Sequence, residues 1–576
     1  MVLEQGSRYA DPVYQAAHED TFSKPVVEGV PAVLPPGVSR QDFDDALEKI
    51  AKAIGEGAIF KGEALKEYVD PYEIPEGRYE RNLPGAAVCP ASVEELQAAL
   101  KVVNDFKIPV WTISRGKNLG YGGPAPLVNG SIIMDLHRMD KILEVNEKFG
   151  YAVVEPGVTF GDLYAYCTKN KLKVWPSTAS LGWGSVVGNT LDRGMGFVPS
   201  GIHHENMAGL EVVLANGDIV RTGQFAMSTS TSAHLTHLSF GPTIDGLFLQ
   251  SNLGIVTKLG IHMTPQPQAF MACTFDMPEF DDIETITDVF GSLRRSGVLP
   301  TVVYVFSLVE WSAIKAPRHT FWDKEGPIPE WRLKEMQEEL DVGFWTVKWG
   351  LYGPKNILQA QYDEVQRVVG KEAPTGRLRN VLFSGGEDGG LLEALDVPQP
   401  YGGMFVGVPS MFSIPMVSYY NPQDGSGVGA HGAYSPIVPL DGKTMREWVT
   451  VARKVYESQG LDLLCDFFMG QRHAVFVCML CFDKTNPQQR QAIDSTYNGL
   501  FEAGTRMGLA KYRSHVNHMD QTAELFDFND HAYRRFVETI KDSLDPNGVL
   551  SPGKMGIWPK RFREMRSTNS RHDGAT

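Results

Sequence analysis

Two glycine-rich segments in the first half of the chain place the strongest constraint on its fold. The first is Ser114–Gly123, with the sequence Ser-Arg-Gly-Lys-Asn-Leu-Gly-Tyr-Gly-Gly, and the second is Leu181–Gly194. Glycine lets successive backbone N–H groups turn toward one point, and such a nest binds anions. Arg115 and Lys117 add positive charge to the first loop. Together the loops predict a fold built around a large phosphate-containing ligand.

Neither loop matches a common nucleotide-binding signature. No Gly-Lys-Ser/Thr opens a helix, and the spacing GxGxxG is absent from both segments. Either loop alone is more typical of an ordinary turn, so the prediction depends on the pair. Glu155–Gly157 and Ser251–Thr257 add two tight turns at the ends of strands, and Asp545–Lys554 near the C-terminus is a further one.

The elements around the loops indicate mixed α and β structure. Ser92 and Glu95 form a capping box, and a periodic apolar face then predicts a helix that ends before Pro109. Asn216-Gly217 between two apolar runs predicts a hairpin turn. The predicted strands are Val110–Ile113, Ile132–Leu136, Tyr151–Glu155, Gly209–Leu214 and Asp218–Thr222.

A second domain is predicted from about Pro265 onward, where the pattern changes to longer helices between short apolar runs. The chain has 576 residues, more than one domain usually holds, with 43% hydrophobic and 21% charged residues, as in globular proteins. The fold class expected is α+β. The predicted helices of this region are Trp331–Leu340, Ile357–Val369, Met445–Tyr456 and Gln488–Ala503.

Charge and cysteine content exclude several classes of protein. Fifty-four basic residues against 69 acidic ones give a net charge of −15, which disfavours a nucleic-acid partner. The six scattered cysteines indicate reduced thiols, and Cys478 and Cys481 lie in an apolar run that predicts a packed strand rather than a redox or metal pair. His203-His204-Glu205 and the pair His234 and His237 lack a convincing third ligand, so no metal is expected.

The sequence also bears on where the protein resides. No run approaches the roughly 18 apolar residues of a membrane helix, so no membrane span is expected. The first 15 residues lack the pattern of a signal peptide, and the last three are not a peroxisomal address. We therefore expect an intracellular, cytoplasmic protein.

The order of these segments resembles the vanillyl-alcohol oxidase and p-cresol methylhydroxylase (VAO/PCMH) flavoprotein family. The resemblance runs from about residue 40 to Pro559 and among family members is greatest to the fungal vanillyl-alcohol oxidase type. It implies FAD and a two-domain fold with the flavin ring at the domain interface. The matching segments are Asn118 to Gly123, Gly184 to Gly194, Ile244 to Phe248, Gly254 to Gly260, Tyr512 to His515 and Met519 to Gln521.

The resemblance also implies domain limits and cofactor contacts. It divides the chain into an N-terminal arm (1–40), an FAD-binding domain (41–268 and 506–576) and a cap or substrate domain (269–505). The expected FAD contacts are Ser114, Arg115, Gly116, Lys117, Asn118, Leu119, Gly184, Ser185, Gly188, Asn189, Asp192, Gly194, Ile255, Val256, Arg513 and Lys554.

His431, in the segment Gly429 to Pro436, matches the family histidine that bonds covalently to the flavin 8α-methyl. By itself a histidine among small residues is more typical of a solvated or capping side chain, but the match favours covalent FAD. Tyr72 stands where the family has the histidine that activates this linkage. Because a phenol near pKa 10 is a poorer base than imidazole, we expect the linkage to form slowly or incompletely.

The resemblance further implies a phenol substrate. Tyr121, Tyr512 and Arg513 match the residues that bind the substrate as phenolate, from which a hydride leaves the para benzylic carbon for flavin N5. Ser180 replaces the aspartate near N5, which should impair proton abstraction. His515 and His518 are expected near this pocket because they follow Arg513.

The sequence thus predicts an FAD-dependent oxidase of para-substituted phenols, with oxygen as electron acceptor, in a homodimer or larger homo-oligomer. A dehydrogenase that uses another acceptor stays open. The replacement at Ser180 also leaves open a same-fold enzyme that acts on a non-phenolic alcohol. A third alternative, a non-catalytic flavin-binding protein, is disfavoured by the intact cofactor loops and phenolate residues.

Overall fold

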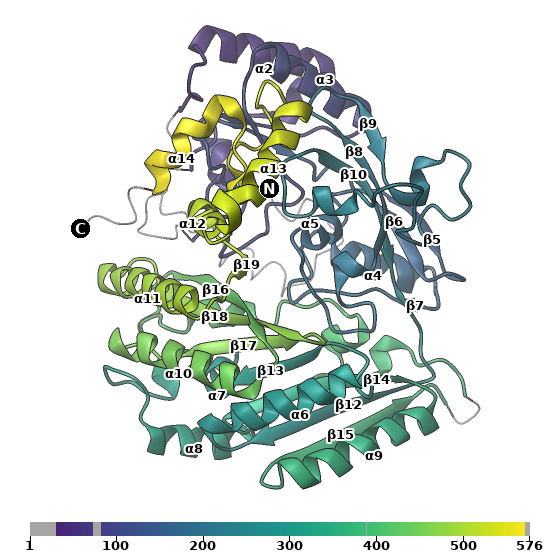
Figure 1. Ribbon diagram of the computed structural model, residues 1–576, viewed down its shortest axis with the longest axis vertical. Helices are drawn as coiled ribbons and strands as arrows, with labels where there is room; N and C mark the ends of the chain where they lie inside the picture. Colours follow the sequence, from purple (N-terminus) through teal and green to yellow (C-terminus); the bar gives the residue numbers. More distant parts are fainter. Residues whose placement is uncertain (1–29, 31, 73–81, 387–388, 571–576) are drawn as a thin grey trace.

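The computed structural model describes residues 30, 32–72, 82–386 and 389–570. Most of the N-terminal arm expected at 1–40 lies outside these residues. Figure 1 shows two parts: the first half of the chain and its C-terminal end form the upper part, and the middle of the chain forms the lower part. None of the helices in the described ranges has the length and apolar character needed to cross a bilayer.

The first sheet of the upper part has the strand order β1-β2-β4-β3, with β2, β4 and β3 parallel. Helices α2 (Arg40–Ile54) and α3 (Val93–Asp105) pack together beside it in one apolar cluster. Half of the predicted capping box is present: the Ser92 hydroxyl accepts the Glu95 N–H, but the Glu95 carboxylate accepts the N–H of Ala91 and not that of Ser92. The strands are β1 (Ile59–Phe60), β2 (Ala86–Val88), β3 (Val110–Ile113) and β4 (Ile132–Asp135).

The second sheet of the upper part is antiparallel, with the order β5-β6-β10-β8-β9. Helices α4 (Phe160–Lys169) and α5 (Val186–Leu191) contribute to its core. The hairpin predicted at Asn216-Gly217 joins β8 and β9, and Gly217 takes the positive φ of 84° that such turns need. The strands are β5 (Ile142–Asn146), β6 (Tyr151–Val154), β8 (Met207–Val213), β9 (Ile219–Arg221) and β10 (Ile255–His262).

The lower part is an eight-stranded antiparallel sheet in the order β15-β12-β14-β13-β17-β18-β16-β19. Cys478 and Cys481 lie buried on β18, so the packed strand predicted there is confirmed. The strands are β12 (Ala269–Met277), β13 (Val303–Ser307), β14 (Trp345–Gly353), β15 (Arg377–Ser384), β16 (Gly429–Pro439), β17 (Leu464–Met469), β18 (His473–Asp483) and β19 (Lys511–Arg513).

Helices cover one face of this sheet. Phe290 of α6 contacts Trp349, and Trp448 of α10 contacts both Tyr434 and Phe476. Because neighbouring residues of a strand point to opposite faces, His431 and Ser435 lie on the face away from these helices. The four helices predicted for this region are present. The helices named here are α6 (Ile283–Arg295), α8 (Glu330–Leu340), α9 (Lys355–Glu372), α10 (Gly442–Ser458) and α11 (Pro487–Arg506).

The C-terminal segment joins the two parts. β19 adds to the edge of the eight-stranded sheet beside β16, although the predicted domain limit fell earlier, at residue 505. The chain then passes through α13 (Phe528–Leu544) and returns to β3, where Val110 exchanges two backbone hydrogen bonds with Val549 and Ser551. The last described residues therefore belong to the upper part.

A buried ion pair fixes the C-terminal turn Asp545–Lys554. Lys541 Nζ lies 2.8 Å from Asp545 Oδ2, both side chains are fully buried, and Lys541 also donates to the carbonyls of Asn252 and Leu550. Asp545 accepts the N–H groups of Val549 and Leu550. This network holds the C-terminal turn against the loop at Asn252, which precedes β10.

We expect Lys541→Met to destabilise the protein by about 3–5 kcal/mol, because it leaves the Asp545 carboxylate charged and unpaired in the interior. Thermal unfolding followed by circular dichroism measures the effect. Exposed Lys52, which pairs with Glu48 on α2, provides the control, and Lys52→Met should change stability by less than about 1 kcal/mol. Equal effects of the two substitutions would contradict the prediction.

Candidate active site

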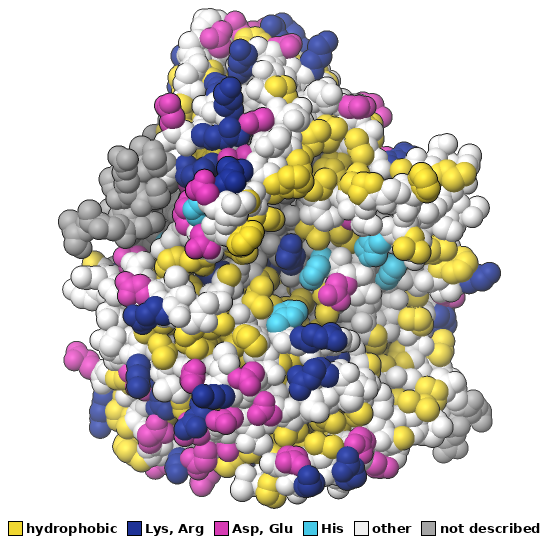
Figure 2. Space-filling model, viewed as in Figure 1, with side chains coloured by type: hydrophobic (Ala, Val, Ile, Leu, Met, Phe, Trp, Pro, Cys, Tyr) yellow, Lys and Arg dark blue, Asp and Glu magenta, His cyan; other side chains and the backbone are white. Residues whose placement is uncertain are grey.

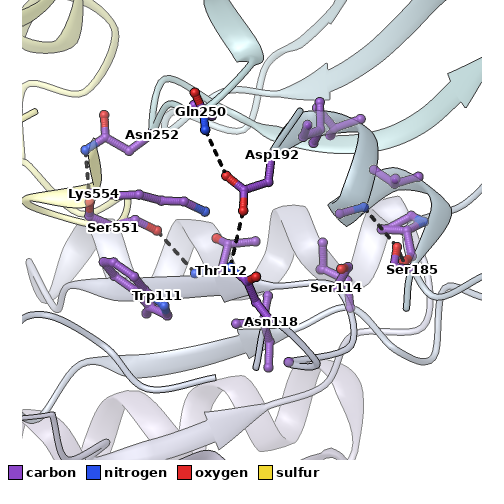
Figure 3. Close-up of a pocket in the computed structure, with 18 of the residues that line it drawn as sticks. Trp111, Thr112, Ser114, Asn118, Ser185, Asp192, Gln250, Asn252, Ser551 and Lys554 are labelled. Carbon is purple, nitrogen blue, oxygen red and sulfur yellow. Dashed lines mark hydrogen bonds between the residues drawn. The ribbon is translucent and has the colours of Figure 1, made fainter. Parts of the chain in front are cut away.

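A long cavity lies between the two sheets of the upper part and is open on one side. Its lining comes from the first glycine-rich loop, the start of α5, the start of β10 and the C-terminal turn (Figure 3). The predicted contacts that line it are Ser114, Arg115, Gly116, Lys117, Asn118, Gly184, Ser185, Gly188, Asn189, Asp192, Ile255, Val256, Arg513 and Lys554. Fourteen separate positions of the chain thus converge on one site.

Glycine keeps this cavity open where the two loops meet. A Cβ on Gly188 would lie 2.3 Å from the Ser114 hydroxyl oxygen, so only glycine allows the turn of α5 to approach β3's end this closely. Ser185 caps α5 by accepting the Gly188 N–H and donates its own proton to the Pro156 carbonyl. The second glycine-rich segment is therefore held by its own side chains.

Two half-buried lysines bring positive charge to the cavity. Burial, with Arg115 nearby, lowers the pKa of Lys117 to about 7. Burial also lowers the pKa of Lys554, whose ammonium lies 5.7 Å from the centre of the Trp111 ring. A bound anion would restore the charge of both groups, because an opposite charge favours the ionised form. The lining therefore fits a ligand that carries phosphate groups.

Asp192 connects the cavity to the residues of the lower part. Its carboxylate accepts hydrogen bonds from Asn118 (3.3 Å) and Gln250 (3.2 Å), as Figure 3 shows, and pairs with Arg513 Nε at 2.9 Å. Arg513 also donates to the Asp192 carbonyl, and Gln250 donates to the carbonyl of Tyr512. Asp192 was predicted as a cofactor contact, and here it also orients the guanidinium.

Tyr121, Tyr512 and Arg513 meet at one point. The guanidinium carbon of Arg513 lies 5.1 Å from the centre of each tyrosine ring, and the Tyr121 hydroxyl is 3.3 Å from that of Ser435 on β16. Although burial disfavours its charge, the Asp192 carboxylate and both phenols raise the pKa of Arg513, so it stays cationic. Burial raises the pKa of both tyrosines, which therefore keep their protons. The cluster offers two O–H donors beside a fixed positive charge.

His431 lies half-buried beside this cluster, with its Nδ1 atom inaccessible to solvent. Burial lowers its pKa to about 4, so the imidazole is neutral, and its Nδ1 has no hydrogen-bond partner among the described residues. The Tyr72 ring packs edge-on against it, with centroids 5.1 Å apart. A neutral, desolvated imidazole nitrogen without a partner has the chemistry of a nucleophile.

The His431 ring lies so close to Gly120 that an added Cβ would clash with it. The φ of Gly120 is +77°, and a Cβ there would lie 2.6 Å from His431 Cε1 and 2.7 Å from Nδ1. We expect Gly120→Ala to cost about 1–3 kcal/mol, because it combines a disfavoured backbone conformation with displacement of the imidazole. Denaturant unfolding measures this. Gly217→Ala is the control: its φ is +84°, but the added Cβ would meet no other atom, so this variant reports backbone strain alone. An equal loss of stability in the two variants would contradict a steric clash at Gly120.

Several predicted residues lie outside the cavity lining. Leu119 is buried in the apolar core of the lower part, and Gly194 packs against the Asn189 side chain, so both shape the loops instead. Tyr72 and His431 lie next to each other away from the lining. Ser180 is half-buried in the segment between β7 (Val174–Trp175) and Gly182.

Three further histidines make contacts that stabilise the fold. His203 bonds Asn189 Oδ1 and the Ser177 hydroxyl through its two ring nitrogens, and burial lowers its pKa to about 3. His515 Nε2 forms a hydrogen bond of 2.9 Å with the carboxylate of Asp70, which precedes Tyr72 by two residues in the chain. His518 stacks on Tyr497, with ring centroids 3.9 Å apart.

Sequence reasoning missed the residues that close the cavity from the side of the C-terminal turn. Ser551 accepts the Thr112 N–H through its hydroxyl, and Asn252 donates to the Ser551 carbonyl (Figure 3). Gln250 has a φ of +45°, a strained value that nothing in its sequence neighbourhood predicts. In the space-filling view, histidine, basic and acidic side chains gather around a hollow between the upper and lower parts (Figure 2).

These features fit FAD. The glycine-rich loops and the half-buried lysines suit the pyrophosphate, and the unpartnered His431 nitrogen suits the edge of the flavin ring. The fold and site define a flavin-dependent oxidoreductase. The FAD binding domain family matches residues 84–223. The chain belongs to the VAO/PCMH family of flavoproteins, as the following comparisons show.

The relatives cover nearly the whole chain. The 4-cresol dehydrogenase [hydroxylating] flavoprotein subunit of Pseudomonas putida is 32% identical over 532 residues, which is 91% of this chain and 98% of the relative. The structure of 4-ethylphenol oxidase from Gulosibacter chungangensis, in complex with isoeugenol, matches with a TM-score of 0.84 and 31% identity over 92% of this chain and all of that one. Substrate-bound p-cresol methylhydroxylase also gives 0.84, at 32% identity over 92% and 99%.

Proposed function

We propose that this protein oxidises para-substituted phenols. The observation that carries the proposal is the meeting of Tyr121, Tyr512 and Arg513 at one buried point beside the cofactor cavity. Two hydroxyl donors and a guanidinium bind an aryl oxygen more tightly as the anion than as the neutral phenol. The names of the relatives, which act on 4-cresol and 4-ethylphenol, support the same substrate class.

The residues of the chain would act in sequence on the substrate. Tyr121 and Tyr512 donate hydrogen bonds to the phenol oxygen, and Arg513 lowers the pKa of the bound phenol by placing a positive charge beside it. The phenolate then pushes electron density into the ring, so that a hydride can leave the para benzylic carbon and a quinone methide forms. When bound, the flavin supplies the acceptor for that hydride at N5.

We infer that the flavin is attached covalently through His431 and that oxygen reoxidises it. The neutral imidazole and its unpartnered Nδ1 support the attachment. Tyr72, in edge contact with His431, is a weak base at neutral pH and would make the attachment slow. Because one relative is named a dehydrogenase and another an oxidase, the acceptor needs a direct test.

A second candidate is oxidation of a non-phenolic alcohol. Ser180 supports it, because a serine is not ionised at neutral pH and cannot act as the base that an aspartate at this position provides in vanillyl-alcohol oxidase. The phenolate cluster favours the first proposal, since a saturated alcohol would make no use of Arg513.

Stopped-flow spectroscopy tests both proposals. The oxidised flavin is mixed anaerobically with a panel of 4-alkylphenols and, in parallel, with non-phenolic benzylic alcohols. We expect bleaching with the phenols alone, and recovery of the flavin absorbance when oxygen is admitted. Reduction by the alcohols but by none of the phenols would reject the phenol assignment, and no recovery in oxygen would indicate a different acceptor.

A further inference from the structure

Three side chains with metal-ligating atoms meet at one edge of the first sheet of the upper part. Cys89 directly follows β2, Asp135 ends β4, and His137 lies two residues further along the chain. Because β2 and β4 are parallel neighbours, Cys89 and Asp135 lie side by side where these strands end. The Cys89 sulfur, a carboxylate oxygen of Asp135 and a ring nitrogen of His137 all lie within 4.8 Å of one another. No other group of three such ligands comes together in the part of the chain that the structure describes.

The three side chains are shielded from solvent and are close to the spacing that a zinc ion requires. Cys89 is fully buried, Asp135 is 5% exposed and the His137 side chain is 12% exposed. His137 Nδ1 lies 3.0 Å from Asp135 Oδ2. Nitrogen and oxygen ligands bind tetrahedral zinc at about 2.0–2.2 Å, which places them roughly 3.4 Å apart, and sulfur binds at about 2.3 Å. A zinc ion would therefore require only a small inward movement of the Cys89 side chain.

Hydrogen bonds from neighbouring groups hold these ligands in place. The Tyr68 hydroxyl donates to Asp135 Oδ2 at 2.9 Å and lies 3.7 Å from the Cys89 sulfur. The backbone N–H of His137 donates to the other carboxylate oxygen, Asp135 Oδ1, at 3.0 Å. Arg138 donates to the backbone carbonyl of Cys89. Partners of this kind orient the ligands of metal sites, so the orienting contacts are present together with the ligands.

The set of ligand atoms suits zinc in chemistry and in charge. Zinc binds cysteine sulfur, histidine nitrogen and carboxylate oxygen, whereas magnesium and calcium prefer oxygen ligands. Because metal ligands bind in their deprotonated forms, the thiolate and the carboxylate together carry two negative charges beside a neutral imidazole. These charges balance the charge of Zn²⁺, and a neutral complex avoids the cost of an uncompensated charge in a buried site.

We propose that Cys89, Asp135 and His137 form a binding site for one zinc ion. The metal bonds to Cys89 Sγ, a carboxylate oxygen of Asp135 and His137 Nδ1, and water takes the fourth position, as in other zinc sites with three protein ligands. The thiol proton passes to solvent, and no group is oxidised or reduced. The ion joins the ends of β2 and β4 at the edge of the sheet where the first glycine-rich loop leaves β3. This role is structural and does not depend on the proposed phenol oxidation.

The test measures metal uptake by the FAD-loaded protein after dialysis against a chelator. We expect the unaltered protein to bind one zinc ion per chain, and its thermal unfolding midpoint to rise with zinc concentration because the ion binds the folded form. Co²⁺ serves as a spectroscopic probe, since its d–d bands in a tetrahedral site lie at longer wavelengths than the flavin absorbance. Cys89→Ser should weaken zinc binding by more than about 100-fold, because loss of an orienting partner alone costs about 10- to 100-fold. The same substitution should abolish the tetrahedral Co²⁺ bands.

Three further variants separate coordination from folding. Cys167→Ser is the matched control, because Cys167 is similarly buried in the upper part, on α4, and belongs to no such group of ligands in the described chain. It should keep the zinc affinity and the Co²⁺ bands. His137→Asn removes a ligand whose side chain is partly exposed, and it should weaken zinc binding as strongly as Cys89→Ser. Tyr68→Phe should weaken binding by about 10- to 100-fold and keep the Co²⁺ bands, because it removes an orienting hydrogen bond and no ligand.

Bound flavin absorbance and circular dichroism show whether each variant is folded. Failure of the unaltered protein to take up zinc would overturn the inference and leave the cluster as a hydrogen-bond network. Equal uptake by the unaltered protein, Cys89→Ser and His137→Asn would identify an adventitious ion only and would overturn it as well. Reduction of the flavin by phenols plays no part in these measurements, so the proposed function and this inference can fail separately.

Discussion

Replacement of Arg513 by methionine is expected to lower the rate of flavin reduction by 4-alkylphenols about 1000-fold. Arg513 is the positive charge at the point where the substrate oxygen would ionise, and removal of one donor of this kind commonly costs 100- to 1000-fold. The substitution also leaves Asp192 without its ion-pair partner, and because both side chains are half-buried we expect a smaller loss of stability than the roughly 3–5 kcal/mol of a fully buried pair. Stopped-flow reduction measures the rate, and the ultraviolet difference spectrum of a bound, unreactive phenol reports whether it binds as phenolate.

The structure provides a matched control for this experiment. Arg318 in the lower part is about as buried as Arg513 and pairs with Asp462 at 2.6 Å, and neither residue contacts the phenolate cluster in the described part of the chain. Arg318→Met should lower stability while the folded enzyme keeps its reduction rate and binds the phenol as phenolate. A rate for Arg513→Met within tenfold of the unaltered enzyme would reject the role of Arg513 as the anion partner.

Replacement of His431 by alanine is expected to abolish covalent attachment of the flavin. The unaltered protein should keep a fluorescent flavin band after denaturation and electrophoresis, and His431→Ala should show none while it still binds FAD reversibly. The reason is chemical: the buried Nδ1 of His431 is the nucleophile that we propose for this attachment. His473→Ala, on the exposed start of β18, is the control and should keep the band.

A companion substitution tests the role of the neighbouring phenol. Tyr72→His places an imidazole of pKa near 6.5 beside His431, and we expect it to speed attachment when FAD is added to the apoprotein. The time course of fluorescent band formation measures this. A band that persists in His431→Ala would show that another residue carries the flavin.

Local features of the fold were predictable from sequence because they depend on neighbours in the chain. Ser92 marks the start of α3, since a cap needs only the residues of the first turn. Gly217 marks the β8–β9 hairpin, since that turn needs a positive φ. The glycine-rich loops indicated a phosphate-containing ligand for the same reason, and the resemblance then supplied FAD and the phenolate residues.

Long-range features required the tertiary structure. Asp466 on β17 and Glu310 on α7 (Leu308–Lys315) are separated by more than 150 positions, and no periodicity relates them, so only the sheet register and the position of α7 bring them together. Gln250 and Ser551 likewise reach the cavity through contacts between distant segments.

The sequence by itself thus determined the local turns and caps, the glycine-rich loops and, through resemblance, the cofactor and the residues that we propose hold a phenolate. The tertiary structure decided the ionisation of those residues. The physical reason is that the charge of a side chain depends on burial and on its neighbours in space. Arg513 stays cationic because Asp192 lies beside it, and burial raises the pKa of Asp466 to about 6.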